Sequence, residues 1–193
     1  MRIVIAGIIG GIIMFIWTTL AHTLLPIGEM GVKLPVEQPA ALSVLATTAT
    51  SGPGVYMYPS IAPEKMSDQA AMTAFNEQNR NSAFAFVVYQ AGGNPVMSNM
   101  VPNMIKQFVS VVLAALIAAW VLSLGASGFA GRVLAAGGLG LFAWLAINVP
   151  YWNWYMFPTA FTIGSGLEQV IGWLLAGAGI AWWLGRGDRA RVV

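Results

Sequence analysis

Long apolar runs constrain this chain more than any other feature, and the first extends over residues 3–25. At about 1.5 Å per residue, a helix of that length reaches roughly 34 Å, enough to cross the hydrocarbon of a bilayer. Lipid offers backbone amides no hydrogen-bond partner, so a run of this kind in lipid must be helical. Further runs cover residues 102–124, 133–149 and 167–184, and an interfacial segment from Thr159 is an alternative start for the last. The sequence therefore predicts an all-α membrane protein with a bundle of four transmembrane helices.

The composition excludes several classes of protein. Only 8% of the residues are charged and 58% are hydrophobic, whereas about a quarter of a soluble domain is charged. The net charge of +2 is too small to indicate a nucleic-acid partner. The absence of cysteine excludes disulfides, thiolate metal sites and thiol–quinone exchange.

The first apolar run has a rival interpretation as a cleaved secretory signal peptide. Residues 19–21, Thr-Leu-Ala, weakly resemble a small-residue cleavage site. However, the charged n-region is only Met1-Arg2, and the apolar stretch is longer than a usual signal core. We expect the segment to be retained as a membrane helix.

Residues 26–101 form one long polar stretch with its own secondary structure. We expect a helix over 39–48, a strand over 54–58, a helix from the N-cap Ser67 to Asn79, and a strand over 83–90. The two strands are expected to pair. The predicted organisation is a first transmembrane helix (1–25), a small α+β extracytoplasmic cap (26–101), and three further transmembrane helices with a cytoplasmic tail (102–193).

The basic residues predict how the chain is oriented in the membrane. Five arginines near the ends of the predicted spans fall on one side of the membrane, whereas the loop over 151–161 has no charge. Four other basic residues, Lys33, Lys65, Arg80 and Lys106, are spread through or just after the long polar segment, where the charge rule has little force. Positive charge in short loops favours the cytoplasm, so both termini and the 125–132 loop are expected there. The five arginines are Arg2, Arg132, Arg186, Arg189 and Arg191.

Three polar residues lie in or near the outer ends of the predicted helices: His22, Asn148 and Glu168. Residues eleven apart share a helix face, and each of these shares its face with a glycine. The glycines are Gly11, Gly137 and Gly179, and Gly172, four residues after Glu168, lies on the same face. Small residues mark the side on which membrane helices approach closely. We predict that the three side chains point into the bundle as a polar cluster, which Gln107 and Ser110 could join.

The cluster has a functional and a structural interpretation. An acid beside an imidazole could bind a ligand or handle protons, because ionisable groups inside membranes are often functional. Alternatively, Ser165-Gly166-Leu167-Glu168 matches a capping box, in which Glu168 only satisfies the first amides of a helix. The structural interpretation, helix capping and packing, is favoured.

Met97, Met100 and Met104 are spaced as on one helix face. Thioethers suit Cu(I), and His22 could be a further ligand. Methionine also fills gaps in irregular interfaces, and this interpretation is favoured, so no cofactor is predicted.

Small residues four apart are expected to pack helices within the chain. The pairs are Gly7 with Gly11, Ala136 with Gly140, and Gly172 with Ala176.

The junction after the first helix resembles a family of short, four-span bacterial inner-membrane proteins of no known activity. The residues concerned are Trp17, His22, the run Leu25-Pro26-Ile27-Gly28-Glu29-Met30-Gly31 and the run Gly54-Val55-Tyr56-Met57-Tyr58-Pro59. The resemblance implies a bacterial inner membrane and supplies no catalytic residue. The order of elements is also similar to that of claudin-like proteins, but the paired cysteines of that group are absent here, so the likeness is one of architecture only.

No motif in the sequence identifies a reaction, so no catalytic residue is assigned. The favoured function is a non-enzymatic accessory or interaction subunit that contacts the lipid bilayer and binds a membrane-protein partner or a second copy of itself. One alternative is a small oligomeric transporter, channel or ligand-binding module that uses the polar cluster. Another is an enzyme acting on lipid or quinone, which a single histidine and the absence of cysteine make less favoured.

Overall fold

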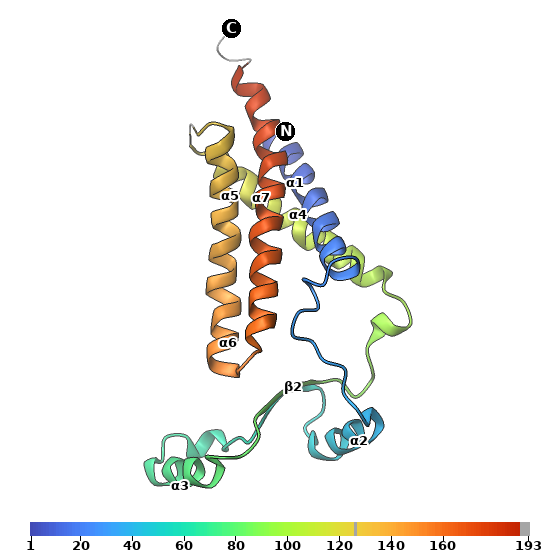
Figure 1. The fold of residues 1–193 in the computed structure, drawn as a ribbon, viewed down its shortest axis with the longest axis vertical. Helices are drawn as coiled ribbons and strands as arrows, with labels where there is room; N and C mark the ends of the chain where they lie inside the picture. The colour runs from blue at the N-terminus through green and yellow to red at the C-terminus, as the bar shows by residue number, and fades with distance from the viewer. Residues whose placement is uncertain (126, 190–193) are drawn as a thin grey trace. The chain divides into compact units, whose positions relative to one another are not determined.

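The computed structural model describes residues 1–125 and 127–189, and their side chains as far as Arg186. The fold is mostly helical (69%) and contains one small two-stranded sheet. The chain forms two compact units (Figure 1). The first unit comprises Met1–Lys33 and the chain from Asn99 onward, and the second comprises Leu34–Ser98.

Four helices of the first unit are long and apolar enough to cross a membrane, as the sequence predicts. Two of them are α1 (Arg2–Thr23) and α4 (Val101–Ser123). The third is continuous over Phe129–Tyr155 and consists of α5 (Phe129–Ala143), a π-helical segment η3 (Trp144–Asn148) and α6 (Val149–Tyr155). The fourth is α7 (Thr159–Arg189).

The third and fourth helices are longer than predicted. Pro150 does not end the third helix, because the π-helical segment lies immediately before it. Proline lacks an N–H and clashes with the carbonyl four residues earlier, and a local π-turn relieves that clash. The third helix therefore continues through Pro150 to Tyr155, into the segment predicted as a loop. α7 begins at Thr159, so the interfacial segment considered from Thr159 is continuous with the span predicted from Leu167.

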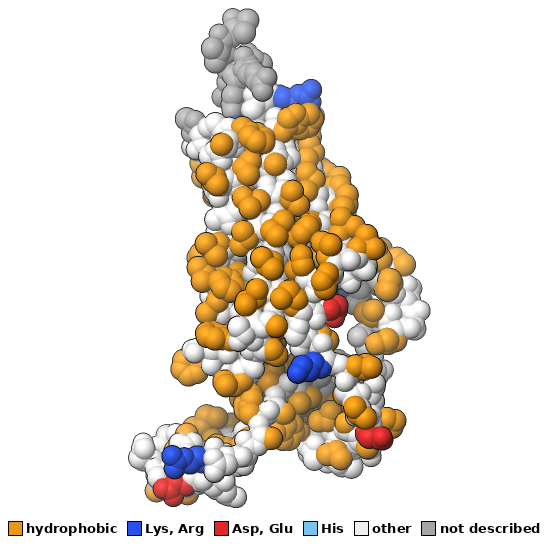
Figure 2. Space-filling view, viewed as in Figure 1, with side chains coloured by type: hydrophobic (Ala, Val, Ile, Leu, Met, Phe, Trp, Pro, Cys, Tyr) orange, Lys and Arg blue, Asp and Glu red, His pale blue; other side chains and the backbone are white. Residues whose placement is uncertain are grey.

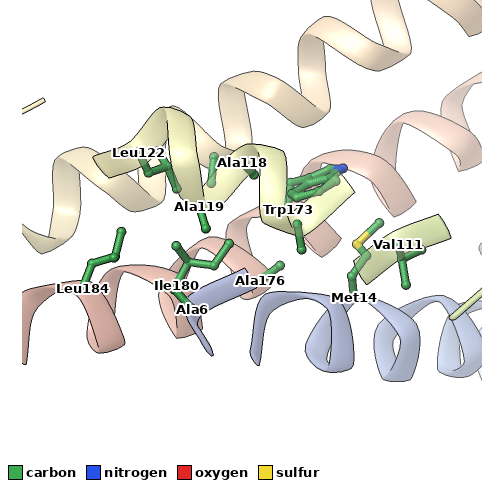
Figure 3. Packing of buried hydrophobic residues seen from close by; sticks show 12 residues of the cluster. Ala6, Met14, Val111, Ala118, Ala119, Leu122, Trp173, Ala176, Ile180 and Leu184 are labelled. Carbon is green, nitrogen blue, oxygen red and sulfur yellow. The ribbon is translucent and has the colours of Figure 1, made fainter. Parts of the chain in front are cut away.

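Within the first unit, α7 packs against both α5 and α1, and α1 also packs against α4. Glycines allow these close approaches: a methyl group at Gly11 would lie 2.7 Å from the Cα of Val112, and one at Gly177 would lie 2.3 Å from the Cβ of Ala136. The expectation that small residues pack helices within the chain is confirmed. Figure 3 shows the buried core between the helices, which includes Ala6, Met14, Ala115, Ala119, Trp173, Ala176 and Ile180.

The second unit contains α2 (Gln38–Thr48), β1 (Gly54–Tyr58), η1 (Pro63–Lys65), α3 (Gln69–Asn79), β2 (Ala85–Tyr89) and η2 (Pro95–Met97). β1 and β2 pair antiparallel with Val55 opposite Val88, so the predicted pairing is confirmed. The cap of α3 is Asp68 rather than Ser67, and its carboxylate accepts hydrogen bonds from the amides of Ala70 and Ala71. Ala49 is the one buried residue of Leu34–Ser98, a segment that is described in full.

Candidate functional site

His22 lies in the last turn of α1, with its imidazole between two carboxylates. Nδ1 is 3.3 Å from Oε1 of Glu29, which follows α1, and Nε2 is 3.4 Å from Oε2 of Glu168 on α7. The side chains of Glu29, His22 and Glu168 are 60%, 44% and 13% exposed. The three groups, which we call the His22 cluster, thus extend from an exposed acid to a largely buried one.

The chain after α1 folds back to bring Glu29 to the ring. The amide of Gly28 donates to the carbonyl of Ala21 at 2.9 Å. A methyl group at Gly28 would lie 2.4 Å from Nδ1 of His22, so the backbone rests against the imidazole. Gly31 has a φ of +80° and approaches the backbone of Phe161 on α7 so closely that a Cβ would lie 2.8 Å from its nitrogen. Glycine at these positions thus allows the turn and its packing.

Glu168 is held by the contact between α1 and α7. The indole Nε1 of Trp17 donates a hydrogen bond of 2.9 Å to the main-chain oxygen of Glu168. One turn further along α7, a methyl group at Gly172 would lie 2.6 Å from Sδ of Met14 and from Cδ1 of Trp17. The carboxylate of Glu168 therefore projects from a fixed position toward the end of α1.

The capping-box interpretation of Glu168 is wrong. Because α7 begins at Thr159, Ser165 lies inside the helix, where its hydroxyl donates to the carbonyl of Phe161 at 3.0 Å. The amides near Glu168 are bonded within the helix and need no cap. Its side chain is instead engaged with His22.

No contact of the described residues joins Asn148 to the His22 cluster. It is half-buried and lines a hollow of about 270 Å³ together with Ile147, Tyr151, Phe157, Phe161 and Thr162. A second hollow of about 410 Å³ shares Phe157 and lies at the turn between α6 and α7. The third helix packs on a different face of α7 from α1: Gly166 approaches Trp144, whereas Gly172 approaches Met14 and Trp17.

The remaining predicted site residues are not drawn into the cluster by any contact described. Gln107 is exposed on α4. Met100 and Met104 are exposed in the first unit, and Met97 belongs to the second. Both ring nitrogens of His22 face carboxylates, so neither is directed toward the methionines as a ligand for the predicted Cu(I) site. Among the described residues, no group of three or more His, Asp or Glu side chains is arranged to hold a metal ion.

Glu29 is the member of the cluster that sequence reasoning missed. It lies seven residues after His22, beyond the end of the helix, so helical periodicity does not relate the two. The available signal was the turn itself, because Pro26 and Gly28 between them favour a reversal of the chain. A polar residue just past such a turn is a candidate partner for the last turn of the helix.

Comparison with models of known protein families, with curated proteins and with solved structures found no match to this chain. The resemblance based on residues 17–31 and 54–59 therefore stays a prediction. The function must be argued from the geometry.

Proposed function

We propose that this chain is a multi-pass protein of the bacterial inner membrane that acts as a non-enzymatic interaction subunit of a membrane assembly. The observation that supports this most is the poor burial in Leu34–Ser98, where only Ala49 is buried although the whole segment is described. A unit of this size normally needs a substantial core or an external staple. We propose that a partner covers its apolar surface.

The paired strands supply the proposed contact surface. Val55 and Val88 lie opposite each other on one face of the sheet, 60% and 74% exposed, and Met57 on the same face is 39% exposed. A two-stranded sheet is marginal in water unless it packs against another element. Clustered exposed apolar residues are typical of protein interaction sites.

Insertion into a membrane is supported by the outward faces of the helices. Figure 2 shows hydrophobic side chains spread over the visible face of the bundle. On α1, every fourth residue is apolar and exposed, a stripe that would be unfavourable in water and suits lipid. The stripe consists of Val4, Ile8, Ile12 and Ile16.

The proposed orientation has both termini in the cytoplasm and residues 26–101 outside. The beginnings of α1 and α5 and the end of α7 lie at one end of the bundle (Figure 1), and Arg2, Arg132 and Arg186 belong to these segments. Arg186 lies 4.5 Å from the ring centre of Trp182, an arrangement that suits a headgroup region. Arg191, which the sequence also places there, lies outside the described residues.

A pair of matched variants tests the interaction proposal. Val88→Lys places a charge on the exposed sheet face, and Gln78→Lys places one on exposed α3. Each tagged protein is purified from native membranes in mild detergent and compared with wild type by size-exclusion chromatography and mass spectrometry. We expect a defined companion, or a second copy, to be lost only in Val88→Lys. A chain that elutes alone in all three preparations contradicts the proposal.

A further inference from the structure

We propose that Glu29, His22 and Glu168 form a proton-binding relay, in which His22 passes a proton between the exposed carboxylate of Glu29 and the largely buried carboxylate of Glu168. This activity goes beyond the interaction role and does not depend on it. It follows from the placement of one imidazole between two acids that differ strongly in exposure, 60% against 13%.

The number of protons in the cluster follows from its hydrogen-bonding groups. An ionised carboxylate only accepts hydrogen bonds, and a neutral imidazole has one N–H to donate. With both acids ionised and the ring neutral, one carboxylate would face a ring lone pair. The geometry is satisfied when one more proton is present, either on the ring as imidazolium or on one of the acids. The His22 cluster is therefore arranged to bind one proton.

The transfer is balanced in atoms and needs no electron donor or acceptor. A proton from water binds Glu29, which is open to solvent. Glu29 gives this proton to Nδ1 of His22, while the proton on Nε2 moves to Glu168. Glu29 ends as a carboxylate, the ring ends as the Nδ1–H tautomer and Glu168 ends as a carboxylic acid. The reverse transfer restores the Nε2–H tautomer.

The surroundings of the cluster hold the relay in register. The backbone at Gly28 rests against the imidazole of His22, and the indole of Trp17 donates to the main-chain oxygen of Glu168. These contacts hold the imidazole and the backbone that carries the Glu168 carboxylate in place. Among the described residues, the carboxylates of Glu29 and Glu168 each form an ion pair with His22. Nδ1 of His22 is hydrogen-bonded to Glu29 at 3.3 Å, whereas Nε2 and the Glu168 carboxylate, 3.4 Å apart, are at ion-pair distance. The relay requires the second contact to shorten to a charge-assisted hydrogen bond when the proton is shared.

The contacts can be tested directly, because His22 is the sole histidine of the chain. Full-length protein with ¹⁵N-labelled histidine in detergent gives ring nitrogen resonances that report the tautomer. Glu168→Gln should favour the Nδ1–H tautomer bonded to Glu29, and Glu29→Gln the Nε2–H tautomer bonded to Glu168. We expect the tautomer ratio to change by roughly fivefold in opposite directions, as for the loss of one hydrogen bond. Glu77→Gln, outside the cluster, should leave the ratio unchanged.

Transfer itself is tested by time-resolved infrared spectroscopy after a drop in pH. The carboxylic-acid band of Glu168 is assigned by its loss in Glu168→Gln. In His22→Gln, which keeps a polar side chain of similar reach, this band should rise at least about tenfold more slowly than in wild type. Equal rates overturn the relay, and tautomer ratios that match wild type in both acid variants overturn the cluster. Neither result bears on the copurification test, so the two proposals fail separately.

Discussion

Gly140 on α5 provides the sharpest test of the helix packing. A methyl group there would lie 2.6 Å from the main-chain oxygen of Gln169 and 2.9 Å from Cδ1 of Trp173, both on α7. A backbone oxygen cannot rotate away, so Gly140→Ala must push α5 and α7 apart. Gly138 lies two residues away on the same helix, is exposed, and has no such neighbour within 4 Å. The two substitutions are chemically identical and differ only in what the methyl group meets.

The magnitude follows from two terms. Replacing glycine by alanine in a helix gains about 1 kcal/mol of propensity, and this gain is common to both variants. Overpacking costs about 1–3 kcal/mol and applies only to Gly140→Ala. The difference between the variants is therefore the overpacking term. At about 2–4 °C per kcal/mol, Gly140→Ala should melt roughly 2–12 °C below Gly138→Ala.

The assay is thermal unfolding of both purified variants in one detergent, monitored by tryptophan fluorescence, with wild type alongside. Gly138→Ala should melt at or above the wild-type temperature. If the two variants melt together, or if Gly138→Ala is the less stable, the close approach of α5 and α7 is refuted. Both variants should still reach the membrane fraction, because neither changes the hydropathy of the helix.

Three further predictions use the same melting assay. Trp17→Phe removes the indole that bonds a carbonyl of α7 and should cost about 0.5–1.5 kcal/mol, whereas Trp120→Phe, at an exposed position, should cost less. Gly31→Ala should destabilise more than Gly93→Ala: both glycines have positive φ, but only the first lies against α7. Arg132→Met removes the buried guanidinium whose Nε donates to the carbonyl of Leu122, and it should lower the free energy of unfolding by about 1–3 kcal/mol. Arg132→Lys, which keeps a positive charge and a donor, should lose less stability.

The apolar runs were sufficient to predict the four long helices, because length and hydropathy alone decide whether a helix can cross a bilayer. The strands predicted over 54–58 and 83–90 are present at Gly54–Tyr58 and Ala85–Tyr89, because aromatic and β-branched residues lie between turn signals. Helix boundaries were the weakest part. The run over 133–149 predicts a helix that ends before Pro150, because a sequence pattern does not show that a π-turn accommodates a proline inside an apolar helix.

The candidate site was half predicted. Periodicity correctly placed His22 and Glu168 on facing helices, and the structure brings them to 3.4 Å. Asn148 also lies on the side of its helix that faces α7, where it lines a hollow with Phe161 and Thr162. The prediction of a single cluster assumed that all helices meet around one axis. Periodicity gives the face of each helix but not the neighbour that each face meets.

The two units of the chain differ in what their sequences can stabilise. In the first, alanine and glycine at the helix contacts remove the obstacle to close packing, and exposed apolar residues are satisfied once lipid surrounds them. In Leu34–Ser98, three apolar residues, Leu34, Val36 and Val88, are 87%, 83% and 74% exposed. Exposing apolar surface to water contributes no stabilising free energy to the fold. Charged substitutions there should therefore improve the solubility of the isolated protein while weakening any assembly that covers them. The exposed apolar side chains of this segment are thus the observation on which the proposed binding partner rests.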